Sequence, residues 1–94
     1  MSEAHFKVRA PFQITDRGTV LTGDIVGGTL RLGMTLHCAL PGGANHTLTV
    51  SAIESFDDLQ RKDHWHGLMF RENPDVGTLK TAYPKGSIIT LEET

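Results

Sequence analysis

Residues 6–14, Phe6-Lys7-Val8-Arg9-Ala10-Pro11-Phe12-Gln13-Ile14, decide the fold class. Apolar residues occupy every second position of this stretch, and polar residues or proline separate them. Successive side chains of a β-strand point to opposite faces, so the pattern predicts a strand that places its apolar groups on one face. Pro11 has no N–H group, and we expect a break in strand pairing there.

Further segments of strand character follow, and turn-forming residues separate them. The expected strands cover residues 19–26, 30–32, 34–40, 48–53, 64–71 and 88–91. The expected turns lie at residues 16–18, 27–28, 41–45, 73–77 and 84–86. Residues 56–63 read as a polar loop, and residues 78–83 have no clear assignment.

Short strands with frequent turns and no long helix are typical of an all-β sandwich or barrel. Closure of the sheet removes exposed strand edges, which favours a barrel in a chain of 94 residues. We therefore predict one domain, residues 1–94 with a core over 6–91, folded as a small closed six- to seven-stranded antiparallel barrel with Greek-key-like connections.

Three positions predict local features of this sheet. Gly23 lies inside an expected strand and predicts a bend or a close backbone approach. The alternation of apolar and polar residues changes phase after Ala52, which predicts a β-bulge between Ser51 and Ile53. Cys38 shares the phase of Leu36 and is expected to be a buried thiol.

Composition excludes several classes of protein. Nine basic and eleven acidic residues give a formal charge of -2, which argues against a general nucleic-acid binder. One cysteine cannot form an internal disulfide. The N-terminus has no apolar signal region, and no apolar run approaches the roughly 20 residues of a membrane helix. We expect a cytoplasmic protein that does not associate with membranes.

Residues 17–33 resemble the second domain, a β-barrel, of elongation factor Tu and related translational GTPases. The family pattern is R-G-T-V-x-T-G-x-[IV]-x-x-G-x-[IV]-x-[VL]-G, and the chain reads Arg17-Gly18-Thr19-Val20-Leu21-Thr22-Gly23-Asp24-Ile25-Val26-Gly27-Gly28-Thr29-Leu30-Arg31-Leu32-Gly33. Residues 53–56, 67–71 and 85–89 are similar to later segments of that domain, in the same order. The resemblance implies a barrel of the translation-protein type and a translation-related role.

In that family one face of the barrel holds the terminal adenosine of aminoacyl-tRNA. The resemblance implies an RNA-end site at the matching positions, which are Ile25, Gly28, Leu30, Glu54 and Met69. A carboxylate beside small apolar groups can accept a hydrogen bond from an adenine edge. The alternative is that Glu54 is a solvated strand residue beside the bulge. Asp57 stands where the family has an arginine.

Catalytic machinery is not apparent in the sequence. There is no G-x-x-x-x-G-K-[ST] phosphate loop, so nucleotide hydrolysis is not expected. No nucleophile and base form a convincing pair, and no cofactor is expected. The chain is predicted not to be an enzyme.

Two further clusters suggest binding. His64 and His66 share one face of an expected strand, where two imidazoles can chelate zinc or nickel if a third ligand joins them. Trp65, Phe70 and Tyr83 suggest an apolar interface. Together with the resemblance, these features lead us to expect a non-catalytic binding or adaptor module that presents its surface to a protein partner or an RNA end. The alternatives are a structural homo-oligomer and a histidine-based metal-binding protein.

Overall fold

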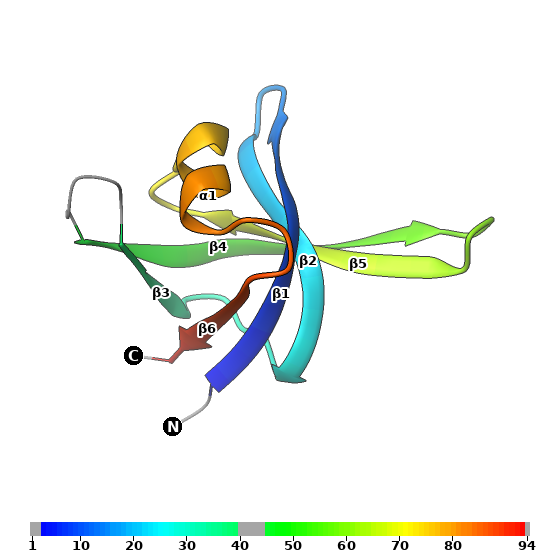
Figure 1. Cartoon of the computed structure of the whole chain (residues 1–94), viewed down its shortest axis with the longest axis horizontal. Coiled ribbons are helices and arrows are strands. Elements are labelled where there is room, and N and C mark those ends of the chain that lie inside the picture. Colours follow the sequence, from blue (N-terminus) through cyan, green and yellow to red (C-terminus); the bar gives the residue numbers. More distant parts are fainter. Residues whose placement is uncertain (1–2, 40–44, 94) are drawn as a thin grey trace.

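The computed structural model describes residues 3–39 and 45–93, which form six β-strands and one short helix (Figure 1). The elements in chain order are β1 (Glu3–Ile14), β2 (Gly18–Gly28), β3 (Thr35–Ala39), β4 (Asn45–Asp58), β5 (Asp63–Phe70), α1 (Val76–Ala82) and β6 (Ile88–Glu92). The strands pair antiparallel in the closed order β1-β2-β5-β4-β3-β6, and β6 returns to β1. The predicted small, closed, antiparallel all-β fold is confirmed.

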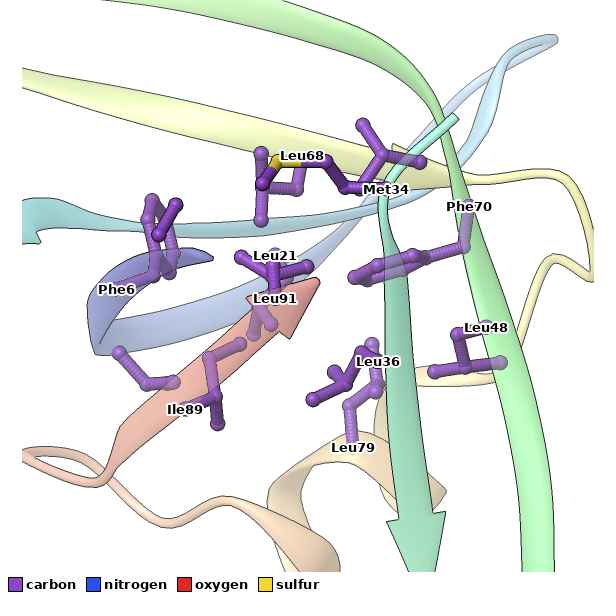
Figure 2. Close-up of a cluster of buried hydrophobic side chains, with 13 residues drawn as sticks. Phe6, Leu21, Met34, Leu36, Leu48, Leu68, Phe70, Leu79, Ile89 and Leu91 are labelled. Carbon is purple, nitrogen blue, oxygen red and sulfur yellow. The ribbon is translucent and has the colours of Figure 1, made fainter. Parts of the chain in front are cut away.

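The interior of the closed sheet is apolar (Figure 2). Every strand contributes to it, and α1 adds Leu79, which is fully buried. The cluster consists of Ala4, Phe6, Val8, Leu21, Met34, Leu36, Leu48, Val50, Leu68, Phe70, Leu79, Ile89 and Leu91. Full burial of one large aliphatic or aromatic side chain is worth about 1.5–3 kcal/mol, so this cluster is the main source of stability.

The alternation in β1 changes phase midway, which corrects the prediction for its second half. Phe6 and Val8 lie in the core, but a register shift between Val8 and Ala10 inserts one extra residue, Arg9, opposite β2. A bulge of this kind re-aims every side chain beyond it. Phe12 is therefore 54% exposed, whereas the core face was expected for it. The break in pairing precedes Pro11, which is buried and pairs with Leu21.

Four other segments differ from the predictions. Residues 30–32 are not a strand, because the chain there crosses from β2 to β3, and Leu32 is exposed. Residues 56–63 are not a loop, because β4 continues to Asp58 and only residues 59–62 turn the chain into β5. The turn predicted at residues 27–28 is still part of β2, where Gly28 pairs with Ala4. Residues 76–82, which straddle a predicted turn and an unassigned segment, form α1.

Two predicted local features are confirmed. A β-carbon on Gly23 would overlap the carbonyl oxygen of Lys7 and lie 2.6 Å from the ring of Phe6, so glycine permits a close backbone approach here. The bulge expected between Ser51 and Ile53 appears as a register shift between Val50 and Ala52. The predicted burial of the Cys38 thiol and most of the predicted loop 41–45 fall outside the described part of the structure.

Two hairpins extend beyond the closed part of the sheet. β6 pairs with only the first part of β1, Glu3–Lys7, and β3 pairs with only Asn45–Thr49 of β4. β2 and β5 pair with each other through Val20–Gly23 and His66–Met69, and beyond this pairing the tips of the β1–β2 and β4–β5 hairpins project from the body in different directions (Figure 1). Strongly twisted two-stranded ribbons diverge in this way. The outer surface where these hairpins cross carries the candidate site.

Candidate functional site

Arg9, the extra residue of the β1 bulge, connects three strands on the outer surface. Its Nε and Nη2 atoms donate hydrogen bonds to the Asp24 carboxylate on β2 at 2.8 and 2.9 Å. Its Nη1 and Nη2 atoms donate to the Asp63 carboxylate on β5 at 2.9 and 3.0 Å. A planar guanidinium matches a carboxylate with two parallel hydrogen bonds, so Arg9 ties both hairpins together.

The charges of this cluster are satisfied internally. Hydrogen bonds to Asp63 and then to Asp24 raise the pKa of the Arg9 guanidinium above its ordinary value. The hydrogen bonds from Arg9 also hold the pKa of the Asp63 carboxyl below its ordinary value. One guanidinium and two carboxylates give the cluster a net charge of -1 at neutral pH. The positive charge of Arg9 is thus already compensated within the fold.

An aromatic pair flanks this cluster on the β4–β5 hairpin. The guanidinium carbon of Arg9 lies 5.3 Å from the ring centroid of Trp65, within the range of a cation–π contact. Trp65 also stacks on Phe56, with ring centroids 5.8 Å apart and an interplanar angle of 14°. Gly67 makes room for the stack, because a β-carbon there would lie 2.8 Å from the Phe56 ring and 2.6 Å from Val20.

A groove of about 820 Å³ opens beside Arg9 and Trp65. We call it the β1 groove, and it is lined by Lys7, Val8, Arg9, Ala10, Phe12, Thr22, Asp24, Trp65, Lys85 and Gly86. The lining includes three cations and one carboxylate, a formal charge of +2, whereas the whole chain carries -2. The groove therefore concentrates positive charge on an otherwise acidic protein.

The loop before β6 forms one wall of the β1 groove. The N–H of Gly86 donates a hydrogen bond to the Val8 carbonyl at 2.9 Å, and the N–H of Val8 donates one to the Ser87 carbonyl at 2.8 Å. These bonds hold Lys85 beside β1. Among the described residues, neither Lys7 nor Lys85 has a side-chain hydrogen bond or an ion pair, and both are exposed. Their charges are available to a ligand.

The part of β1 that lines the groove begins at Lys7 and ends at Phe12, and an exposed apolar side chain lies beside its first residue and at its last. Ile88 of β6 is the cross-strand neighbour of Lys7 and is 62% exposed. Phe12 lines the other end, five residues farther along β1. An extended strand rises about 3.3 Å per residue, so Lys7 and Phe12 are about 16 Å apart along the strand. The groove thus combines accessible positive charge with an exposed apolar side chain in its lining, Phe12, and another beside the lining, Ile88.

The residues implied by the family resemblance lie in three different places. Glu54 and Met69 lie on one outer face of β4–β5, where Arg17 forms an ion pair with Glu54 and contacts the Met69 sulfur at 3.8 Å. Ile25 and Leu30 instead pack against the core. Gly28 lies at the far end of β2, opposite Ala4. Of these five residues, the structure brings together only Glu54 and Met69, and the Glu54 carboxylate is already paired with Arg17.

The two candidate metal ligands share the opposite face of the β4–β5 hairpin. The ring centroids of His64 and His66 are 6.1 Å apart and meet edge to face. Their cross-strand neighbours are Asp57 and Ser55. Over residues 3–39 and 45–93, no group of three His, Cys, Asp or Glu side chains could hold a metal ion. Metal binding by this pair therefore stays a prediction that requires another ligand.

The predicted apolar interface does not form as expected. Phe70 is 4% exposed and belongs to the core, so it cannot take part in a surface patch. Tyr83 packs partly against the core, and its hydroxyl lies 3.3 Å from the carbonyl of His37. Trp65 is half-buried by Phe56 and Arg9. The three residues therefore do not share one surface.

Several residues of the β1 groove are not evident from sequence. A basic strip of Lys7, Arg9 and Arg31 is suggested by their strand positions, but Arg31 pairs with Glu93 elsewhere. Asp24 and Lys85 carry no motif that marks them. Their approach to Arg9 and Lys7 depends on strand register and on the Gly86–Val8 hydrogen bond, which local patterns do not reveal.

Comparisons with known proteins find no match among family models, curated proteins or solved structures. In the described part of the chain, no helix has the length and apolar character needed to span a membrane. The assignment of function therefore depends on the geometry of the site.

Proposed function

We propose that the chain is a non-catalytic binding or adaptor module similar to the second barrel of translational GTPases. It contacts a protein partner through the β1 groove. The observation that carries the proposal is the groove itself. It is about 820 Å³ in volume, and Lys7 and Lys85 at its rim have no partner among the described residues. Concave sites with an apolar wall and a few charged groups are the usual form of a binding site.

The rigidity of the groove supports the same conclusion. Arg9 holds Asp24 and Asp63 with four hydrogen bonds and lies over Trp65. These contacts preform the wall before a partner arrives. A preformed site loses less conformational entropy on binding, which increases affinity.

The sequence resemblance provides a second line of support. Residues 17–33 follow the family pattern in order, and the closed antiparallel sheet is compatible with a barrel of that type. The resemblance favours a translation-related partner. It gives less support to binding of an RNA acceptor end, because Glu54 is paired with Arg17.

The test is affinity capture from the native host with the tagged full chain, followed by mass spectrometry and RNA analysis. The double variant Lys7→Glu/Lys85→Glu reverses the free charge of the groove. Lys80→Glu is the matched control, because Lys80 is an exposed lysine on α1 outside the groove. We expect a protein that is retained by the wild type and by Lys80→Glu but lost with the double variant.

Two results would contradict the proposal. One is that no captured protein depends on Lys7 and Lys85. The other is that the wild type captures RNA and the Glu54→Ala variant does not. That result would indicate that the chain binds an RNA end at Glu54 instead. Circular dichroism must first show that the variants fold like the wild type.

A homo-oligomer is a second candidate, favoured by an open strand edge. β3 covers only Asn45–Thr49 of β4, and β5 pairs with the other edge over Val50–Asp58. In the described structure, no strand covers the β3-side edge of residues 52–58. Such an edge can pair with another chain. Analytical ultracentrifugation tests this candidate, which predicts a dimer that Ser55→Pro dissociates by removing an N–H donor from β4.

A further inference from the structure

We infer that the occupant of the β1 groove is a short, extended, acidic segment of a partner protein that carries apolar side chains on both sides of its carboxylates. This inference rests on the proposed function and adds the chemical class of the ligand. It follows from the charge and the length of the groove and from the exposed apolar side chains in and beside its lining.

The accessible charge of the groove is positive. Arg9 is compensated by Asp24 and Asp63, so Lys7 and Lys85 supply the free charge. Gly86 and Val8 are hydrogen-bonded, which keeps the two lysines on neighbouring segments. Carboxylates between them would gain two favourable pairings, whereas a basic segment would meet repulsion.

The dimensions of the groove favour an extended segment. Lys7 and Phe12 are separated by about 16 Å along β1, which about five residues of an extended chain can span. Ile88 beside Lys7 and Phe12 at the other end are 62% and 54% exposed. Apolar side chains at both ends of a short peptide can cover them. Burial of such area contributes about 25 cal/mol per Å².

A protein segment fits this groove better than single-stranded RNA. RNA-binding platforms stack bases on free aromatic faces and follow the backbone with several cations. Trp65 is already stacked on Phe56 and contacted by Arg9, which leaves Phe12 as the exposed aromatic ring of the lining. Of the described cations that line the groove, Lys7 and Lys85 are the two without a partner.

The experiment is selection of a random short-peptide display library on the full chain. We expect enriched peptides with acidic residues flanked by apolar residues. A synthetic peptide of the consensus should bind in fluorescence anisotropy, and Lys7→Glu/Lys85→Glu should weaken binding about tenfold or more, a change of about 1.4 kcal/mol. Lys80→Glu should bind like the wild type. Phe12→Ser and Ile88→Ser, both at exposed positions, should weaken binding by a smaller factor.

The inference fails if the enriched peptides have no acidic excess or bind the charge-reversed variant equally well. It also fails if a single-stranded oligonucleotide ending in CCA binds and that binding is lost with Lys7→Glu/Lys85→Glu. Failure of the ligand class is separable from failure of the proposed function. If a host protein still requires Lys7 and Lys85 for capture, the groove is a binding site for a different kind of segment. If neither peptide nor host protein depends on these lysines, both proposals fall.

Discussion

The interior of the barrel and the outer surface at the crossing of its hairpins are held together by different forces. The interior contains aliphatic and aromatic side chains that are almost completely buried, such as Phe6 and Leu68. The outer surface depends on Arg9, two carboxylates and a stacked aromatic pair, all of which remain partly exposed. Burial of apolar area in the interior therefore supplies most of the free energy of folding. The outer network of charges orients the wall of the groove but adds little to that free energy.

The largest effect should follow a cavity in the interior. Phe6→Ala removes a fully buried ring that also packs on Gly23, and we expect a loss of about 3–5 kcal/mol in the free energy of unfolding. Urea denaturation followed by circular dichroism measures this loss. Phe12→Ala is the matched control, because Phe12 is largely exposed and its removal should cost less than about 1 kcal/mol. Equal losses for both variants would contradict the distinction between interior and outer surface.

Two glycines allow a direct comparison of the regions with the same substitution. Gly23→Ala forces a methyl group against the Lys7 carbonyl, which is backbone, and should destabilise the protein by about 3 kcal/mol. Gly67→Ala meets the side chains of buried Val20 and of Phe56 rather than backbone atoms, and should cost less, about 2 kcal/mol. Thermal and urea unfolding measure both.

Only the Gly67 variant should disturb the Phe56–Trp65 stack directly, so the fluorescence maximum of Trp65 should move with Gly67→Ala more than with Gly23→Ala. The reverse order of stability, or a Trp65 shift confined to Gly23→Ala, would show that the two faces are not independent.

Arg9→Met tests the outer network and its dependence on pH. The variant loses both carboxylate pairs, but these are partly exposed, so we expect a loss of less than about 1 kcal/mol at neutral pH. The folded-state pKa of Asp63 is below its ordinary value, so its stabilising contribution is present above about pH 4 and is lost as the pH falls through the folded value.

Urea denaturation of both proteins over this pH range is the measurement. Wild type and Arg9→Met should therefore differ near neutrality and converge in acid. A difference that persists at the lowest pH would assign the effect of Arg9 to packing on Trp65 rather than to its charge.

The smallest effect is expected at the N-terminus of α1. The Asp75 carboxylate accepts hydrogen bonds from the Thr78 N–H and hydroxyl, and these bonds hold its pKa below the ordinary value. Asp75→Asn can still accept a hydrogen bond, so it should lower the melting temperature less than Asp75→Ala. Both shifts should be smaller than that of Leu79→Ala, because Leu79 anchors the helix in the core. A larger shift for Asp75→Ala than for Leu79→Ala would reverse this order.

The sequence predicted correctly the features that depend on neighbouring residues, and it failed for features that depend on contacts between segments distant in sequence. Alternation of apolar residues correctly placed most strands, and the close approach at Gly23 and the bulge beside Ser51 were also predicted. The second half of β1 was predicted on the wrong face, because the bulge at Arg9 arises from pairing with β2 and leaves no interruption in the local pattern. The prediction that Phe70 belongs to a surface interface was wrong for a similar reason, since strand register decides which face of β5 meets the core.

The candidate site was predicted only in fragments. His64 and His66 were correctly expected on one face, and Trp65 was singled out, but the connection of Trp65 to Arg9 was not. Asp63 follows β4 by a short turn, whereas Asp24 is on another hairpin, so only the folded sheet brings both to one guanidinium. Because residues 56–63 were predicted to be a loop, the length of the projecting β4–β5 hairpin was not predicted.

By itself the sequence determined that the chain forms a small antiparallel β-fold with an apolar interior, because a two-residue period of hydrophobicity is a local property of each strand. Tertiary structure decided where the bulge of β1 falls, how far the hairpins extend, and which charges lie together at the β1 groove. These features depend on the register between strands distant in sequence, and register is settled by the packing and hydrogen bonding of the whole sheet.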